Sequence, residues 1–153
     1  MAAVLETARA LRAVPPLDHD IILVFSDAEE MGDHGAHAFA TQHAWMREVA
    51  LAVNYESMGT DGPGTLYVTS KNNAALVGAL ATSMPHGFGN SVITAFFNAI
   101  PDMRNACDLR DYVDVGAAGV GFVLHGQTQN YHPELDDMGH LDPRSLQSFG
   151  DSA

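Results

Sequence analysis

Two adjacent carboxylates, Glu29 and Glu30, follow an apolar run and the polar step Ser26-Asp27, and they are the side chains of this sequence best suited to chemistry. The run spans residues 21–25 and is predicted to be a buried strand, so the pair would stand at its C-terminal end, where α/β enzymes present functional groups. Adjacent side chains point in different directions. One carboxylate can therefore bind a metal ion while the other stays free to accept a proton.

Two further candidates, Glu56 and His132, occupy comparable positions later in the chain. Glu56 closes a second apolar run, residues 49–55, and His132 lies in a polar loop directly after Tyr131. Imidazole and carboxylate groups together suit zinc or a similar divalent ion. Each residue taken alone also fits a solvated surface side chain, so the interpretation depends on their combination. Of the seven other histidines, His34 lies nearest to the acidic pair.

Composition restricts the partners and the kind of metal site. The chain has 153 residues, enough for one domain with an ordinary core. Its 7 basic and 19 acidic residues give a formal net charge of −12, which would repel a nucleic-acid backbone. No window approaches the roughly 18 apolar residues of a membrane span. Because Cys107 is the only cysteine, an internal disulfide and a cysteine-rich zinc site are both excluded, and a metal would need Asp, Glu and His ligands.

The elements that would position these side chains alternate between helix and strand, which predicts a single α/β layer structure. A first helix is expected to end before Pro15 and Pro16, and a last helix is expected to begin at Asp142 and Pro143. Between them the patterns predict strands at 21–25, 49–55, 65–69 and 120–124, and helices at 36–43 and 73–84. The residues from 125 to 137 are predicted to form a long polar loop.

Four ordered segments resemble the bimetallic zinc aminopeptidase family, also called metallopeptidase family twenty-eight. They are Ile22-Leu23-Val24-Phe25-Ser26-Asp27-Ala28-Glu29-Glu30-Met31-Gly32, Gly35-Ala36, Asn54-Tyr55-Glu56-Ser57-Met58-Gly59 and Tyr131-His132-Pro133-Glu134-Leu135-Asp136. With Leu141-Asp142-Pro143-Arg144-Ser145-Leu146 behind them, they cover nearly the whole chain. The acid at Glu56 places the resemblance in the branch similar to endoplasmic-reticulum metallopeptidases.

The resemblance implies a fold and a set of roles. The fold would be α/β, with a mixed, mainly parallel sheet flanked by helices, as in zinc aminopeptidases and phosphorylase/hydrolase-like proteins. Glu29 would be the general base, Glu30 and His132 would bind one zinc ion, and Glu56 would bind the other. Asp136 and Tyr131 would lie beside the ligands and orient them. The substrate would be a peptide, cleaved at its N-terminal bond by a water molecule that the metal activates.

The same resemblance implies that residues 1–153 form a single, partial catalytic domain that is incomplete at its N-terminus. Two further ligands of the family, a His and a bridging Asp, would precede Met1. The complete domain would hold two zinc ions and this chain one or none, which leaves its own activity open. Missing strands would expose a sheet edge and favour self-association.

Two alternative functions remain open at this stage. The first is a transferase of the glutaminyl-cyclase type, which uses a single zinc ion. The second is a non-catalytic interaction module. The compartment is not readable from the sequence, although relatives are often exported or membrane-anchored.

Overall fold

The computed structural model describes residues 1–84, 86–99 and 107–152 and has an α/β fold. Among these residues, none of the helices is both long and apolar enough to cross a membrane. In chain order the elements are α1 (Ala2–Leu11), α2 (His34–Gln42), the 3-10 turn η1 (Ala44–Glu48), β1 (Leu51–Ser57), β2 (Thr65–Thr69), α3 (Ala74–Ser83), β3 (Phe88–Gly89), α4 (Ser91–Ala99), α6 (Leu109–Asp114), β4 (Ala118–Leu124), the 3-10 turn η2 (Thr128–Asn130) and α7 (Pro143–Ser152).

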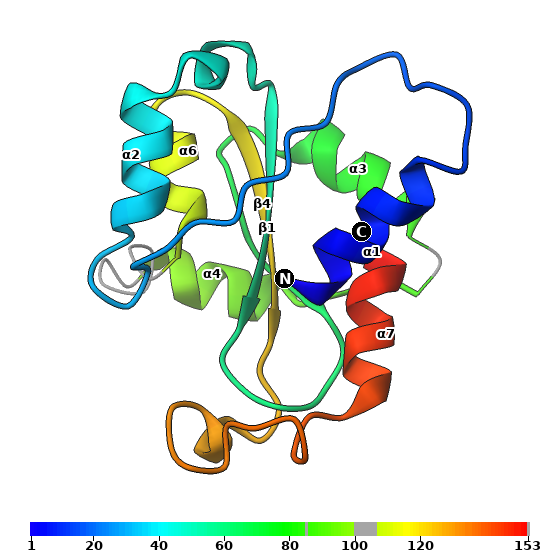
Figure 1. Cartoon of the computed structure of the whole chain (residues 1–153), viewed down its shortest axis with the longest axis vertical. Helices are drawn as coiled ribbons and strands as arrows, with labels where there is room; N and C mark the ends of the chain where they lie inside the picture. Colours follow the sequence, from blue (N-terminus) through cyan, green and yellow to red (C-terminus); the bar gives the residue numbers. More distant parts are fainter. Residues whose placement is uncertain (85, 100–106, 153) are drawn as a thin grey trace.

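The sheet is open and mixed, with strand order β1-β4-β2-β3 (Figure 1). β1 runs parallel to β4, β2 runs antiparallel to β4, and β3 pairs with β2 in parallel. The central strand β4 is a nearly continuous apolar run and is buried from Gly119 to Leu124. Gly121 lets β2 approach closely, because a Cβ atom there would lie 2.6 Å from Cγ1 of Val68. Two of the three pairings are therefore parallel, which confirms the predicted fold class.

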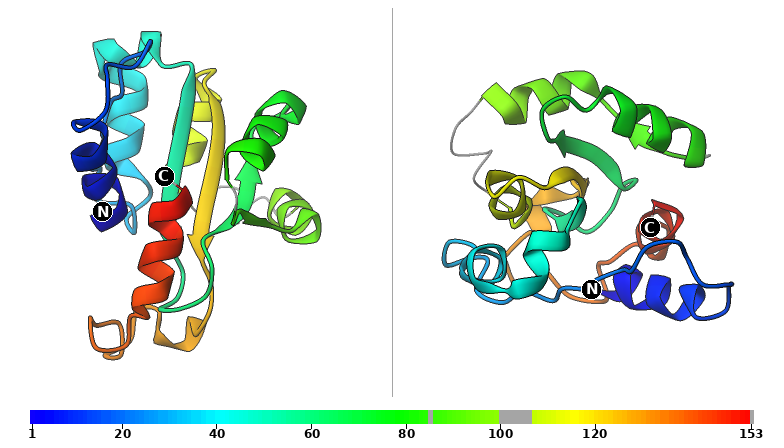
Figure 2. Two further views of the ribbon diagram at one scale, coloured as in Figure 1. Left: turned by 90° about the vertical axis from the view of Figure 1, so that its right-hand side faces the viewer. Right: turned by 90° about the horizontal axis from the view of Figure 1, so that it is seen from above.

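Side chains from both faces of β4 form two core clusters. Phe122 and Val120 pack with Phe149 of α7 and Ala3 of α1. On the other face, Val123 packs with side chains that include Leu109 of α6. Figure 2 shows α1 and α7 close together on one side of the strands. The helices therefore hold the sheet as a central layer, with β4 at its middle.

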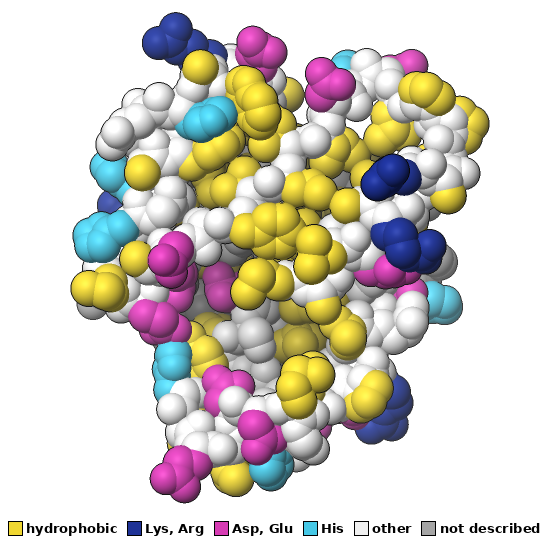
Figure 3. Space-filling model, viewed as in Figure 1, with side chains coloured by type: hydrophobic (Ala, Val, Ile, Leu, Met, Phe, Trp, Pro, Cys, Tyr) yellow, Lys and Arg dark blue, Asp and Glu magenta, His cyan; other side chains and the backbone are white. Residues whose placement is uncertain are grey.

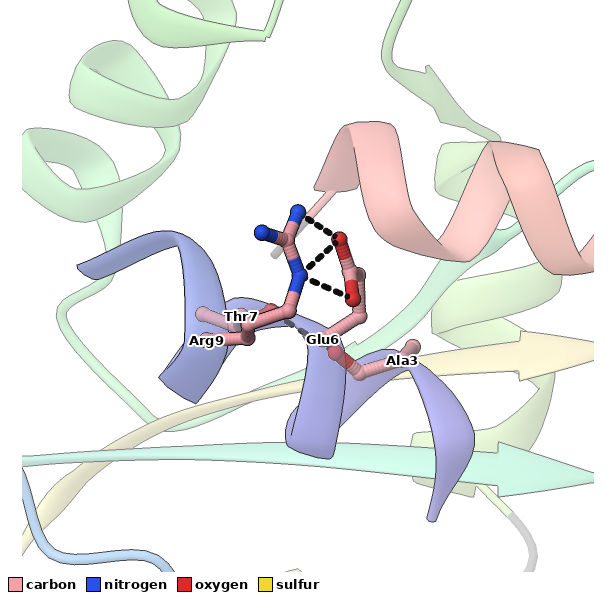
Figure 4. Close-up of polar contacts among 4 residues, drawn as sticks. All are labelled: Ala3, Glu6, Thr7 and Arg9. Atoms are coloured by element: carbon pink, nitrogen blue, oxygen red, sulfur yellow. Dashed lines mark hydrogen bonds and ion pairs between the residues drawn. The ribbon is translucent and has the colours of Figure 1, made fainter. Parts of the chain in front are cut away.

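Helix α1 is held against α7 by apolar packing. The small side chain of Ala3 is 5% exposed and allows α1 to lie against α7. On the solvent side, the Arg9 guanidinium donates to Glu6, with 2.8 Å between Nε and Oε2, and the Thr7 hydroxyl donates to the Ala3 carbonyl at 2.8 Å (Figure 4). Both of these bonds lie within α1 itself, so the apolar contact with α7 is what attaches the helix.

The strand predicted at residues 21–25 is wrong. The structure assigns residues 21–28 to no strand, and Ile21, Leu23 and Phe25 are 53%, 38% and 46% exposed. Leu51 and Val53 of β1 are also exposed, and Figure 3 shows a broad apolar surface on this face of the molecule. An apolar run becomes a buried strand only when another layer covers it, and the described residues do not supply that cover. The other predicted helices and strands are confirmed, with ends that shift by up to two residues.

Candidate metal and catalytic site

The parallel pairing of β1 and β4 brings the predicted site together at one edge of the sheet. Glu56 lies opposite Val123 in the register, so both strands end side by side. β4 then continues into the loop that carries His132, and the strand arrows of β1 and β4 point toward this loop in Figure 1. The carboxyl ends of parallel strands thus place an acid and an imidazole from distant parts of the sequence at the same end of the molecule.

Glu29 and Glu30 lie in a tight turn in front of α2. Ala28 has a left-handed backbone with a φ of 59°, an unfavourable conformation for a residue with a Cβ atom. The amides of Gly32 and Asp33 both donate to the Glu29 carbonyl, at 2.8 and 2.9 Å. The Gly35 amide donates to the Asp27 carbonyl at 3.0 Å, and a Cβ at Gly35 would come within 2.5 Å of that oxygen. Only glycine fits there, and this close approach fixes the turn.

Glu30 and His132 contact each other directly. Nε2 of His132 lies 3.1 Å from Oε1 of Glu30, and both side chains are more than half exposed, at 53% and 62% respectively. The Tyr131 hydroxyl also donates to Oε1 of Glu30, over a longer distance of 3.4 Å. The Tyr131 and His132 rings are 3.8 Å apart, and His132 has a left-handed φ of 70°. The structure therefore brings three of the predicted site residues into contact.

Asp136 lies beside His132 but contacts its backbone. Oδ2 of Asp136 accepts a hydrogen bond from the His132 amide at 3.3 Å. The carboxylate closes the loop from Tyr131 to Asp136 and thereby fixes the position from which the His132 ring extends. This contact agrees with an orienting position, and the role itself stays a prediction.

Glu56 is the most strongly perturbed carboxyl group of the site. Burial, followed by the charge of Glu29, raises the pKa of Glu56 to about 7. Two donors oppose this shift: the Ser57 amide bonds Oε1 at 3.3 Å, and the Asn54 side chain bonds Oε2 at 3.4 Å. A carboxyl group with this pKa is about half ionised at neutral pH and would gain from a nearby cation.

Glu29 is also held in an environment that favours its neutral form. Burial is the largest cause that raises the pKa of Glu29, and the charges of Glu30, Asp33 and Asp108 add to it, while His132 lowers it. A carboxylate with a raised pKa is a stronger base, which is the property needed to take a proton from water. Figure 3 shows acidic side chains gathered on this face, next to the apolar surface.

The donor atoms fit one part of a zinc site. Two ligands of a tetrahedral zinc ion, each about 2.1 Å from the metal, lie roughly 3.4 Å apart. The separation of 3.1 Å between Glu30 and His132 is close to this value. In the described part of the chain, however, no group of three or more His, Cys, Asp or Glu side chains is placed to hold one ion. Glu56 therefore interacts with Glu29 but is not gathered with Glu30 and His132 around one centre.

Two other histidines form similar pairs with carboxylates. Nδ1 of His37 lies 2.9 Å from Asp111, and Nδ1 of His140 lies 2.8 Å from Asp137. Separation alone therefore does not distinguish a metal site. What distinguishes the Glu30–His132 pair is its surroundings, because the charges of Glu30 and His132 both act on Glu29, and the charge of Glu29 acts on Glu56.

Comparison with known proteins identifies the family. The whole chain, residues 1–153, matches the family described as peptidase family M28. The chain belongs to peptidase family M28. This agrees with the resemblance found in the sequence, and it connects the Glu29–Glu30 turn and the His132 loop to a family of peptidases.

Curated relatives of this M28 chain are named as metallopeptidases and proteases. Endoplasmic reticulum metallopeptidase 1 of Rattus norvegicus is 29% identical over 154 residues, which cover 99% of this chain and 17% of the relative. The putative endoplasmic reticulum metallopeptidase 1 of Schizosaccharomyces pombe is also 29% identical, over 99% of this chain and 18% of its own length. The vacuolar membrane protease of Candida albicans (strain WO-1) is 31% identical, over 82% of this chain and 14% of its own length. No solved structure matches the chain.

The M28 chain thus spans only about a sixth of the length of its first relatives, 17% in the rat protein. The coarser part of the functional prediction, membership of a metallopeptidase family, is confirmed by the family match and by the names of the relatives. Cleavage at the N-terminus of the substrate, the use of zinc and the roles of individual residues go beyond this and are proposals.

Three residues near the M28 site were not found by sequence reasoning: Asp108, Ser26 and Asn54. Asp108 accepts a hydrogen bond from the Ser26 hydroxyl, and Asn54 donates to Glu56. An isolated Asp before a short helix, or a Ser or Asn inside an apolar run, carries no local signal for such a contact. The nearest available hint was that Ser26 directly follows the predicted strand at 21–25 and Asn54 interrupts the one at 49–55, each two or three residues before an acid.

Proposed function

We propose that this chain is the catalytic part of a zinc-dependent aminopeptidase, which hydrolyses the N-terminal peptide bond of its substrate. The observation that carries the proposal is the 3.1 Å contact between Glu30 and His132, beside the partly buried Glu29, whose pKa is raised by burial and by neighbouring acids. Membership of peptidase family M28 supports hydrolysis of a peptide as the reaction. The metal-ligand chemistry of Glu and His supports zinc.

In this proposal, Glu30 and His132 hold one zinc ion and Glu56 contributes to the second. When bound there, zinc would supply Lewis-acid polarisation of the scissile carbonyl and activation of a water molecule. The Glu29 carboxylate accepts the proton of the attacking water and passes it to the leaving amine. Tyr131 holds the Glu30 carboxylate through its hydroxyl, at 3.4 Å, and Asp136 holds the backbone of His132.

The acids of the site also supply a driving force for cation binding. Without a cation, the charge of Glu30 raises the pKa of Glu29, and burial together with the charge of Glu29 raises the pKa of Glu56 to about 7. A divalent ion would relieve this repulsion and would release the proton that Glu56 holds near neutral pH. Zinc affinity should therefore rise with pH between about 6 and 8, as Glu56 becomes ionised.

The test is the substitution Glu29→Gln, measured with a 4-nitroanilide of an amino acid as substrate in the presence of zinc. We expect turnover to fall by at least about 100-fold, because the amide cannot accept a proton, while zinc content stays unchanged. Glu134→Gln is the matched control, since Glu134 is an exposed acid in the His132 loop. Retained turnover in Glu29→Gln would remove Glu29 from its assigned role.

A second substrate pair tests the position of cleavage. An aminopeptidase hydrolyses a peptide with a free N-terminus and does not hydrolyse the same peptide after N-acetylation. Equal hydrolysis of both peptides would contradict the aminopeptidase assignment. If a peptide with N-terminal glutamine loses ammonia and no residue is released, the reaction is cyclisation, and the alternative of a glutaminyl-cyclase-type transferase is correct.

A further inference from the structure

Asp108 is a buried carboxyl group to which no role has yet been given. It precedes α6, its residue is only 9% exposed, and its Oδ2 atom accepts a hydrogen bond from the Ser26 hydroxyl across 82 positions of sequence. Its second oxygen, Oδ1, is fully buried and has no hydrogen-bond partner among the residues that the structure describes. A buried carboxyl oxygen without a hydrogen bond lowers the stability of the fold. Its presence therefore calls for an explanation.

The surroundings of Asp108 connect it to the proposed site. Its charge raises the pKa of Glu29, of Asp33 and, more weakly than other causes, of Glu56. These three acids come from the turn before α2, from the N-cap of α2 and from the end of β1. Asp108 therefore lies within electrostatic range of every segment that carries an acid of the site, except the His132 loop.

Asp108 contacts the segment before the Glu29 turn through the hydroxyl of Ser26. Ser26 lies three residues before Glu29, in the segment 21–28 that the sheet does not hold as a strand. On its other side the turn is closed by the Gly35 amide, which donates to Asp27, and a Cβ atom at Gly35 would come 3.2 Å from the Cβ of Ser26. The segment is thus fixed by α2 from one side and by Asp108 from the other.

We propose that Asp108 is a positioning residue, which holds Ser26 and thereby fixes the start of the turn that presents Glu29. Asp108 does not touch the reacting atoms in this proposal, and its side chain acts only through Ser26. The importance of Glu29 for hydrolysis rests on the proposed function, whereas the contact that positions it can be tested without any catalysis.

The test compares amide hydrogen exchange in five metal-free proteins: the unaltered chain, Asp108→Leu, Asp108→Asn, Ser26→Ala and the double variant with Ser26→Ala and Asp108→Leu. The reporters are the amides of Gly32, Asp33 and Gly35, whose hydrogen bonds close the turn. Asp108→Leu keeps a similar volume and loses the acceptor, so exchange of these amides should become on the order of tenfold faster. Asp108→Asn keeps an oxygen that accepts from Ser26, so exchange should remain within about threefold of the unaltered chain.

The control amides are those of Ala117, which bonds the Tyr112 carbonyl at the end of α6, and Thr60, which bonds Gly126. Their exchange should not change, because a positioning role is local to the turn. Ser26→Ala should match Asp108→Leu, and the double variant should add nothing further, since both substitutions remove the same bond. An unchanged turn in Asp108→Leu, or an equal acceleration at the control amides, would overturn the proposal.

Turnover with the amino acid 4-nitroanilide then separates this proposal from the proposed function. If Glu29 is the base, Asp108→Leu lowers kcat and leaves KM and zinc content unchanged, because only the presentation of the base is altered. If the unaltered chain shows no turnover, the proposed function fails. The exchange experiment still decides the role of Asp108 in that case.

Discussion

Replacing Glu56 with Gln should stabilise the metal-free protein at alkaline pH. Burial and the charge of Glu29 raise the pKa of Glu56 from 4.5 to about 7, so folding favours its protonated form. A raised pKa leaves stability intact below pH 4.5 and removes it as the pH rises toward 7 and above. A pKa raised from 4.5 to about 7 corresponds to a cost of about 3 kcal/mol in the free energy of unfolding, which the unaltered protein has above pH 8 and the Gln variant lacks.

The assay is urea unfolding of both proteins at pH 5 and at pH 8 in the presence of a chelator. The advantage of Glu56→Gln in free energy of unfolding should grow by about 2–3 kcal/mol between these two pH values. A constant offset can arise because Gln presents an amide to the donors Asn54 and Ser57, so the change with pH is the quantity to read. Glu48→Gln, at an exposed position, is the control and should show no growing advantage. An equal difference at both pH values would refute the reasoning.

Two further substitutions test the packing that positions the site. Phe122→Ala should lower the free energy of unfolding by about 3–5 kcal/mol in urea unfolding, because Phe122 is 1% exposed at the centre of a core cluster; a loss below 1 kcal/mol would contradict this packing. Gly35→Ala should destabilise the protein by about 1–3 kcal/mol and lower turnover, because its Cβ would meet the Asp27 backbone at 2.5 Å. The matched helix substitution Gly78→Ala has open space and should stabilise by up to about 1 kcal/mol, so an equal effect of both would contradict the account.

Local signals in the sequence predicted much of the fold. The strand at Thr65–Thr69 and the start of α7 at Pro143 were predicted to the residue, because alternation of side chains and the Asp-Pro start of a helix are encoded within a few positions. The elements that were not predicted are β3, α4 and α6, together with the 3-10 turns η1 and η2. β3 has two residues and α6 has six, and α6 exists in its place because Leu109 packs against the far face of β4.

The run at residues 21–25 shows why apolar composition alone does not predict a strand. Its apolar residues satisfy the pattern of a buried strand, but a strand needs a hydrogen-bonding neighbour and a covering layer, and both are tertiary properties. β1 pairs with β4 and, within the described residues, with no strand at its other edge. The run therefore lies half exposed next to that edge.

The candidate site was predictable only in part, because its contacts join segments that are far apart in the sequence. The contact between Glu30 and His132 joins segments about 100 positions apart, and it was expected from a family resemblance rather than from spacing. The link between Asp108 and Ser26 was not expected, because Asp108 stands in no motif and the motif that contains Ser26 carries no signal for its partner. Contacts across the fold are set by how β1, β4 and α6 pack, and local periodicity does not contain that information.

The central claim is that Glu30 and His132 bind zinc together, and a zinc titration followed by side-chain ¹⁵N resonances of histidine tests it most directly. We expect Nε2 of His132 to shift on addition of zinc, and the affinity to fall at least about tenfold in Glu30→Gln and in His132→Ala. The exposed His140–Asp137 pair has a similar separation of 2.8 Å, so His140→Ala is the matched control and should leave the affinity unchanged. A zinc-induced shift at His140 with none at His132, or an affinity that survives His132→Ala, would contradict the account.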